Sequence, residues 1–303
     1  MERKISICIG ELQSRYGAER ALEIAKEIGA DAVDFGLEGQ SVARENSVYT
    51  KSEDEIVTYY TALRRKAEAL GIEIGQTHGR MKAYCKDEAE NEINRRNARL
   101  DCLATAAIGA PATVIHMVTT GEMGPECPVQ TMRDLNFRCY NEFAGYAKEF
   151  GCKVAFETFG DSPKHGCCDF FGNLSEFLMS YNRVCAAGDN ANYMTVCVDT
   201  GHVNKATRFN NNPSPADAIR MLGAHTTLLH LNDNDTFTDQ HKVPGTGTID
   251  WNDVLTALDE VGYRGNYNME LSLRNIGKNF LVEYAEFAVK VMRYMLKERY
   301  GNA

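Results

Sequence analysis

Seven short apolar runs of the sequence end in side chains that can bind a metal ion or move a proton. Intervals of 38, 41 and 42 residues separate His78, His116, Glu157 and Asp199. One candidate ligand therefore recurs in each strand–helix unit. Carboxylate oxygens and imidazole nitrogens are usual protein ligands of divalent Zn, Mn, Co or Mg ions. The spacing predicts that these side chains meet in one site if the fold brings the run ends together. They are Glu38, His78, His116, Glu157, Asp199 with His202, His230 and Glu270.

Two of these residues are glutamates in positions where a carboxylate is costly. Glu157 stands in VAFETF and Glu270 in YNMELSL, and both motifs are mostly apolar. Taking a lone carboxylate out of water costs several kcal/mol unless a metal ion or another cation compensates it. A single histidine in an apolar run is usually a hydrogen-bonded core residue. Three acidic residues at matching positions of three runs fit a purely structural role poorly.

Two further motifs add candidate residues. In CVDTGHVN, Asp199 and His202 are three residues apart at the exit of a run, so both can turn toward one site. In DQHKVPGTGTIDW, Asp239 and His241 are two apart, and alternate residues of an extended segment point the same way. The rest of this motif is interpreted as a shaped loop that leads into a helix and packs its tryptophan at the helix start. Its residues are Pro244, Gly245, Gly247 and Trp251.

The apolar runs have the length and order of barrel strands. There are eight in all, rich in Val and Ile, as expected for strands buried on both faces of a parallel sheet. Segments of helical periodicity such as 18–30, 54–72 and 280–298 separate them, and glycines stand where these helices should end, at Gly29, Gly71, Gly151 and Gly262. Eight strand–helix units predict a single-domain TIM (β/α)8 barrel over residues 1–303. The runs are 4–10, 31–38, 71–79, 112–118, 152–159, 194–202, 226–233 and 266–273.

A doubly wound sheet is the alternative fold, but ICIGELQSRYG lacks the glycine-rich phosphate loop that usually follows its first strand. Long loops are predicted at 119–129, 160–169, 203–216 and 234–248, and all follow strands. This is the side of a barrel that carries the chemistry.

The composition limits the class of protein. A hydrophobic share of 44% and a charged share of 25% are typical of a soluble globular chain. No apolar stretch approaches the roughly 20 residues that span a bilayer, and no secretion signal is evident. The ten cysteines form no C-x-x-C pair, which predicts free thiols and a cytoplasmic location. The net charge of −9 weighs against a nucleic-acid partner.

The motifs AFETFG, CVDTGHVN, LLHLNDN, DQHKVPGTGTIDW and YNMEL, in this order, resemble the xylose isomerase-like TIM barrel superfamily of sugar-phosphate isomerases and epimerases. The resemblance covers essentially the whole chain and is strongest over 152–273. It implies one divalent metal ion (Mn, Co, Mg or Zn) bound by Glu157, Asp199, His230 and Glu270. It is also compatible with a homo-oligomer.

The same superfamily contains apurinic endonucleases of the endonuclease IV type, which use three zinc ions. The resemblance to these enzymes implies additional metal ligands at matching positions, and the chain has the right residue type at each. A three-zinc apurinic endonuclease is therefore the alternative function. The additional positions are His78, His116, His202, Asp239 and His241.

Charge favours a small carbohydrate over DNA as the substrate. The predicted loops at the barrel mouth have at least as many acidic as basic residues. A duplex-binding enzyme contacts several phosphates, each usually met by Lys, Arg or a helix N-terminus. The evident basic pairs, Lys205 with Arg208 and Arg80 with Lys82, suit a sugar hydroxyl or a single phosphate, or are solvated surface charges. A second metal site at Cys167, Cys168 and His165 is not expected, because the spacing does not suit zinc.

The ligand types predict a mechanism. A divalent cation that binds a carbonyl and a neighbouring hydroxyl oxygen acidifies the intervening C–H and stabilises the enediolate. Glu157 and Glu270 are the predicted acid–base catalysts. Epimerisation, aldose–ketose isomerisation and dehydration of a keto-polyol all begin with this proton abstraction and stay open. The residues expected to contact substrate are His78, His116, His202, Asp239, His241 and Arg208.

Overall fold

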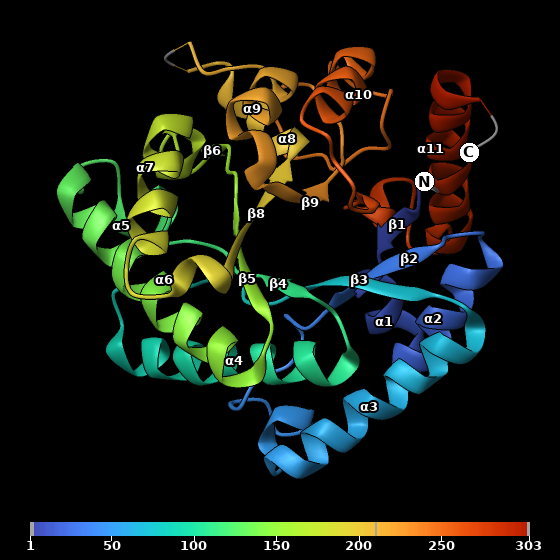
Figure 1. The fold of residues 1–303 in the computed structure, drawn as a ribbon, viewed down its shortest axis with the longest axis horizontal. Coiled ribbons are helices and arrows are strands. Elements are labelled where there is room, and N and C mark those ends of the chain that lie inside the picture. Colours follow the sequence, from blue (N-terminus) through green and yellow to red (C-terminus); the bar gives the residue numbers. More distant parts are fainter. Residues whose placement is uncertain (1–2, 210, 302–303) are drawn as a thin grey trace.

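Eight parallel strands form one sheet in the computed structural model, which describes residues 3–209 and 211–301 (Figure 1). Each of the eight apolar runs contains one of these strands. They are β1 Ile5–Cys8, β2 Ala32–Gly36, β3 Glu73–His78, β4 Ala112–Val114, β5 Lys153–Glu157, β8 Met194–Asp199, β9 Thr226–His230 and β10 Tyr267–Met269.

The sheet curls into a barrel. Its strand order is β10-β1-β2-β3-β4-β5-β8-β9, so every strand pairs with the strand one unit away. The two ends of this order meet through a parallel bridge between Leu231 and Met269, and the Leu231 N–H donates to the Asn268 carbonyl at 2.8 Å. The predicted TIM barrel is therefore confirmed.

Helices surround the strands (Figure 1). They are α1 Gly10–Tyr16, α2 Ala18–Glu27, α3 Glu53–Leu70, α4 Glu88–Ile108, α5 Thr120–Met123, α6 Val129–Phe150, α7 Leu174–Cys185, α8 Thr200–Ala206, α9 Pro215–Leu222, α10 Trp251–Glu260 and α11 Leu281–Tyr300. In α3, the side chains of Ser52 and Glu55 each accept the other's backbone N–H at the helix start. Gly71 ends this helix at φ 67°, a left-handed conformation that suits glycine.

Parts of the predicted loops are ordered elements. The segment 119–129 contains α5, because the Thr119 side chain accepts the Glu122 N–H and caps a helical turn. The segment 160–169 contains a hairpin of β6 (Asp161–Ser162) and β7 (Cys167–Cys168). Helix α8 begins directly after β8, so residues 203–206 of the predicted loop 203–216 are helical.

The buried strand side chains include an apolar group and a polar group. Ala112, Val114, Ala155, Cys197 and Leu228 form a small apolar cluster separate from the large core. Other strand side chains are buried and polar, and they hydrogen-bond with one another: Ser6, Asp34, Gln76 and Asn268. The cysteines are free thiols, as predicted. Among the described residues, no helix is long and apolar enough to cross a membrane.

Candidate metal centre

Four of the predicted ligands converge at the carboxyl ends of β5, β8, β9 and β10. The register pairs Asp199 with His230 directly across β8 and β9. One potential ligand atom from each of Glu157, Asp199, His230 and Glu270 lies within 4.8 Å of the other three. The first three side chains are fully buried, and that of Glu270 is 16% exposed. Three carboxylates and one imidazole at this spacing suit a divalent cation.

The orientation of His230 is set by an aspartate that the sequence analysis missed. Nε2 of His230 lies 3.1 Å from Oδ2 of Asp34, which is fully buried on β2. An N–H donated to this carboxylate leaves Nδ1 as the ligand atom. Nδ1 lies 2.8 Å from Oε1 of Glu157 and 3.3 Å from Oε2 of Glu270. Asp34 lies within an apolar run, the same signal that identified Glu157, and could have been found by it.

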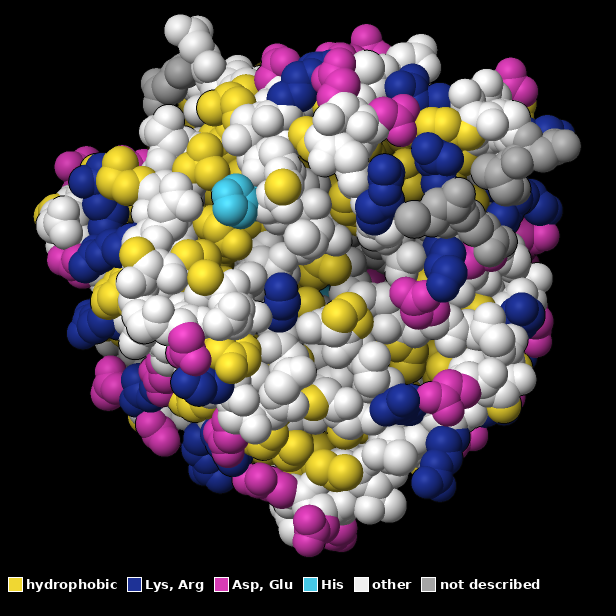
Figure 2. All heavy atoms as spheres, viewed as in Figure 1, with side chains coloured by type: hydrophobic (Ala, Val, Ile, Leu, Met, Phe, Trp, Pro, Cys, Tyr) yellow, Lys and Arg dark blue, Asp and Glu magenta, His cyan; other side chains and the backbone are white. Residues whose placement is uncertain are grey.

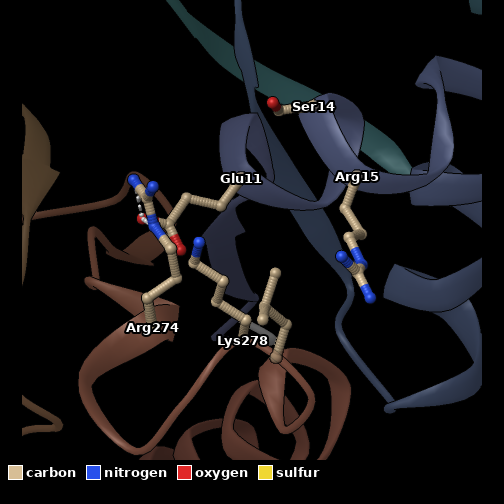
Figure 3. Close-up of a pocket in the computed structure, with 6 residues that line it drawn as sticks. Glu11, Ser14, Arg15, Arg274 and Lys278 are labelled. Atoms are coloured by element: carbon tan, nitrogen blue, oxygen red, sulfur yellow. Dashed lines mark hydrogen bonds and ion pairs between the residues drawn. The ribbon is translucent and has the colours of Figure 1, made fainter.

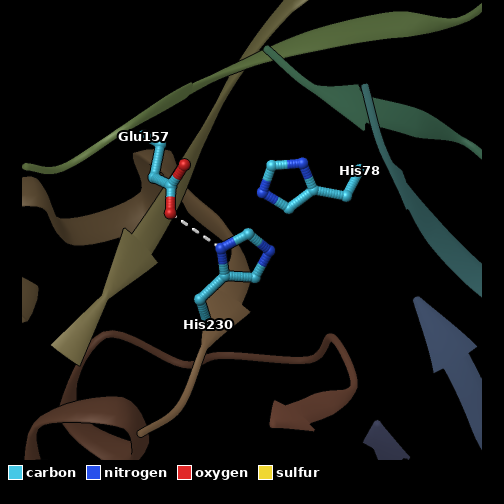
Figure 4. A group of neighbouring side chains, drawn as sticks. All are labelled: His78, Glu157 and His230. Carbon is cyan, nitrogen blue, oxygen red and sulfur yellow. Dashed lines mark hydrogen bonds and ion pairs between the residues drawn. The ribbon is translucent and has the colours of Figure 1, made fainter. Parts of the chain in front are cut away.

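Two further histidines border this group. The ring of His78 stacks on that of His230, with centroids 5.2 Å apart and planes within 8°, and Figure 4 shows both beside Glu157. Nε2 of His116 lies 2.9 Å from Oε2 of Glu157. Within the described part of the chain, the buried ring nitrogens of His78 make no hydrogen bond, although Nε2 is 3.3 Å from Glu270. Such unsatisfied ligand atoms fit a bound cation.

A second cluster lies on the outer side of the same site. Potential ligand atoms of Asp199, His202 and His241 lie within 4.8 Å of one another. Oδ2 of Asp239 is 3.7 Å from Nε2 of His202 and 3.4 Å from Nε2 of His241. The structure thus brings together all the histidines and acids predicted to line the site except Glu38.

The carboxylates and imidazoles shift each other's pKa. Burial disfavours the charged ring of His78, but the adjacent Glu270 carboxylate outweighs it and raises this pKa to about 9. Burial acts in the same way on His241, where Asp239 and Glu270 raise the pKa to about 9. Burial raises the pKa of Asp199 to about 6. Without a metal ion, protons on the imidazoles balance the carboxylates, and a bound divalent cation would take over this role.

Comparison with known proteins agrees with this geometry. The chain matches the Xylose isomerase-like TIM barrel family over residues 22–294. It belongs to this family. A curated relative, the uncharacterized protein MJ1311 of Methanocaldococcus jannaschii, is 26% identical over 200 residues, which are 63% of this chain and 64% of the relative. The predicted family is therefore confirmed.

Solved structures share the xylose isomerase-like fold over nearly the whole chain. D-psicose 3-epimerase from Clostridium cellulolyticum H10, crystallised with D-tagatose, has a TM-score of 0.72 at 16% identity and covers 97% of this chain and 99% of its own. IOLI protein with a bound zinc atom has a TM-score of 0.67 at 16% identity, with 97% of each chain covered. At these identities the likeness establishes the fold.

Three of the four basic residues singled out in the sequence of this xylose isomerase-like barrel are not solvated surface charges. Lys82 is the exception, with a side chain that is 38% exposed. Lys205 is 3% exposed and lies 2.8 Å from Oδ1 of Asp161. Arg208 is 24% exposed and pairs with Asp161 through Nη2. Arg80 is buried and donates to Asp101 at 2.7 Å. A buried cation needs a counter-ion, and only the tertiary structure shows which residue supplies it.

The loop that carries Asp239 and His241 is organised by Asp233. This fully buried carboxylate accepts N–H groups from Gly245 at 3.1 Å and from the Trp251 indole at 2.8 Å. It also accepts the backbone N–H groups of Asn234, Thr248 and Ile249. A Cβ at Gly247 would lie 2.2 Å from its Oδ1. The prediction of a shaped loop with Trp251 packed at the start of α10 is confirmed.

Glu38 lies in a different place from the other predicted residues. It lines a groove on the β1–β2 side, together with Gly10, Gln13 and Tyr59. A neighbouring cavity, drawn in Figure 3, is lined by Glu11, Ser14, Arg15, Arg274, Lys278 and Leu281. Neither hollow is lined by any of the four converging ligands. Among the described residues, the groups of potential ligand atoms close enough to share one ion do not include Cys167, Cys168 or His165.

Proposed function

We propose that this chain is a divalent-metal-dependent isomerase or epimerase of a sugar, sugar phosphate or keto-polyol. The observation that carries the proposal is the pair Glu157 and Glu270, which come from β5 and β10 and both contact Nδ1 of His230. Two carboxylates beside one cation site can remove and return a proton next to a carbonyl group. D-psicose 3-epimerase, which shares the fold, acts in the same class of reaction by its name.

Glu157, Asp199, His230 and Glu270 would hold the metal ion, which is Mn, Co, Mg or Zn in this proposal. When bound, such an ion polarises neighbouring carbonyl and hydroxyl oxygens and so acidifies the C–H between them. The zinc atom in the structure of IOLI protein supports a metal in this fold.

The residues of the chain supply the remaining chemistry. One glutamate of the pair takes the proton from the carbon next to the carbonyl group and leaves an enediolate. The other returns a proton to the opposite face in an epimerase or to the neighbouring carbon in an isomerase. His78, His116 and His202 border the site closely enough to hydrogen-bond substrate oxygens.

Solvent exchange tests this proposal directly. The protein is loaded separately with Mn²⁺, Co²⁺, Mg²⁺ or Zn²⁺ and incubated with ketoses, ketose phosphates and keto-polyols in deuterated water. We expect deuterium at the carbon next to the carbonyl group, detected by NMR, and no exchange after chelation. Absence of exchange with every metal and substrate would refute the proposed reaction.

A second candidate function is a three-metal apurinic endonuclease, and the outer cluster of Asp199, His202 and His241 favours it. Together with His78, His116 and Asp239, that cluster offers ligands for more than one ion. Metal content per chain and incision of an abasic-site duplex distinguish the two functions. One metal ion with deuterium exchange supports the isomerase, whereas three ions with strand incision support the endonuclease.

A further inference from the structure

A cavity of about 290 Å³ opens beside the candidate metal centre. His116, His202 and residues 160–164 of the loop after β5 are among the residues that line it. The ring of Phe159, which also lines it, has its centroid 4.7 Å from that of His202 and 5.6 Å from that of His116. A substrate that is held at the metal centre and extends past these histidines would therefore enter this cavity.

A buried lysine joins the two loops that wall the cavity. Nζ of Lys205, on α8, lies 2.8 Å from Asp161 in the hairpin after β5 and 3.3 Å from Asp239 in the loop after β9. Arg208, one turn further along the chain, pairs with the other oxygen of Asp161. Lys205 is 3% exposed and Asp161 7% exposed, so water screens this pair little, whereas the side chain of Asp239 is 43% exposed.

Among the described residues, the pairing leaves this cavity without a buried lysine or arginine that lacks a carboxylate partner. Three aspartates line it, Asp161, Asp169 and Asp239, together with two lysines, Lys164 and Lys205, and two histidines, His116 and His202. Both carboxylates near Lys205 already compensate its charge, and Lys164 is exposed to solvent at the edge. A phosphate group is normally bound by Arg or Lys side chains that direct unshared N–H groups at it. The buried Lys205 of this cavity already shares its charge with Asp161 and Asp239, so it offers a phosphate group no unpaired cation.

Neutral polar and apolar groups suit a different ligand. The hydroxyl of Ser162 is buried and has no hydrogen-bond partner in the part of the chain that the structure describes. Phe159 and Met81 provide apolar surface next to it. An aromatic face combined with hydroxyl and carboxylate groups matches the C–H and O–H surfaces of a polyol.

We propose that the chain of charges Asp161–Lys205–Asp239 makes this cavity a subsite for an uncharged, hydroxyl-bearing part of the substrate and excludes phosphate esters. Lys205 acts here as a positioning residue, because it holds both loops and cancels their charge. This inference rests on the proposed function and narrows its substrate class to unphosphorylated sugars and keto-polyols, including their glycosides.

The first test compares each ketose with its own phosphate ester in the metal-loaded wild-type protein. We expect the ratio kcat/KM for deuterium exchange to favour the free sugar by about tenfold or more, mainly through KM. Preference for the phosphate ester would overturn the proposal. If no sugar exchanges deuterium, the proposed function fails, and the following binding test still decides the properties of the cavity.

The second test removes one of the two carboxylates from the buried lysine. Asp161→Asn keeps the shape of the side chain but leaves Lys205 with Asp239 alone and Arg208 without its carboxylate partner. Calorimetric titration of the metal-loaded protein with inorganic phosphate should show binding at least about tenfold tighter than in wild type. The double variant Asp161→Asn/Lys205→Met should lose most of this gain, because it removes the freed charge.

The matched control is Asp134→Asn, which removes an exposed carboxylate that pairs with Arg183 at 2.7 Å on the helical surface. It should leave phosphate binding as in wild type, including any phosphate bound by the metal ion itself. Equal phosphate affinity in Asp161→Asn and wild type, with both folded by circular dichroism, would overturn the proposal. If Asp161→Asn does not fold, the comparison of each sugar with its phosphate ester in the wild-type protein decides whether the proposal holds.

Discussion

Glu157 and Glu270 are the residues on which the proposed chemistry depends most. Glu157→Gln and Glu270→Gln keep the shape of each side chain but remove its ability to accept a proton. Deuterium exchange should fall by roughly 10²–10⁴-fold in each variant if the residue is a general acid–base catalyst. Metal content is measured on the same samples, since both residues are also candidate ligands.

Glu176→Gln is the control for these variants, because Glu176 pairs with Arg133 on the outer helices and does not line the metal centre. It should retain the exchange rate of wild type. Near-normal exchange in Glu157→Gln or Glu270→Gln would show that another group moves the proton. If a variant loses both the metal ion and deuterium exchange, the substituted residue is a metal ligand. Its role as a base is then measured at a metal concentration that saturates the variant.

The raised pKa values of His78 and His241 predict that protons and metal compete. Both values lie near 9 in the folded protein and at 6.5 in the unfolded reference, so these rings bind protons more tightly when folded. Their contribution to the stability of the metal-free protein is therefore complete below about pH 6.5 and is lost as the pH rises through about 9. Metal affinity should change in the opposite direction and weaken as the pH falls.

Calorimetry of metal binding at pH 7.5 in buffers of different ionisation enthalpy measures the protons released. We expect about one or more protons per metal ion, because a ring that binds the ion must lose its proton. Denaturant unfolding of the metal-free protein at pH 6 and pH 9 checks the stability. Metal binding without proton release would mean that these rings are already neutral.

At the scale of elements, one carboxylate holds the loop between β9 and α10 in place. Asp233→Ala would leave five N–H donors without their acceptor, and burial makes each loss costly. We expect the free energy of unfolding to fall by about 3 kcal/mol or more in denaturant titrations. Metal affinity should fall as well, because the same loop carries Asp239 and His241.

The matched control is Asp235→Ala, two residues further along the same loop. Asp235 accepts only local N–H and O–H groups of Phe237 and Thr238, and this turn is exposed. Its loss should change the free energy of unfolding by about 1 kcal/mol or less. Equal effects of the two substitutions would contradict the assignment of Asp233 as the organiser of the loop.

At the scale of the whole molecule, the distribution of charge opposes duplex binding. The net charge is −9, and Figure 2 shows acidic and basic side chains interspersed over the face in view rather than gathered into a basic band. Counter-ion release from DNA requires several phosphate contacts by Lys or Arg. We expect an abasic-site duplex to bind weakly at physiological salt, with dissociation constants above about 10⁻⁶ M.

Fluorescence anisotropy with a labelled abasic duplex at 50 mM and 200 mM salt would measure this affinity and its salt dependence. A steep salt dependence with tight binding at low salt would show that phosphate contacts exist and would favour the endonuclease. The same titration with Lys164→Ala tests whether the exposed lysine at the cavity contributes. The predicted absence of a nucleic-acid partner, the cytoplasmic location and the homo-oligomer remain predictions.

The sequence by itself determined the barrel fold and the types of side chain at the carboxyl ends of its strands. Eight apolar runs separated by helical segments suffice for this, because strand length, helix periodicity and glycine stops are local properties of the chain. Acids within apolar runs identified Glu157 and Glu270 by the same local rule, since a buried carboxylate is costly unless a cation or hydrogen-bond donors compensate it. The order of strands then follows from the right-handed connection of each parallel pair.

Only the tertiary structure shows which charged side chains neutralise one another. From the sequence, Lys205 can be interpreted as a surface charge. It is buried because the loops after β5 and β9, which carry Asp161 and Asp239, fold over it. The backbone of His241 adopts φ 42°, which a histidine rarely takes and which local sequence does not predict. Pairing between residues 34 and 44 positions apart depends on strand register and loop packing, and these are set by the whole fold.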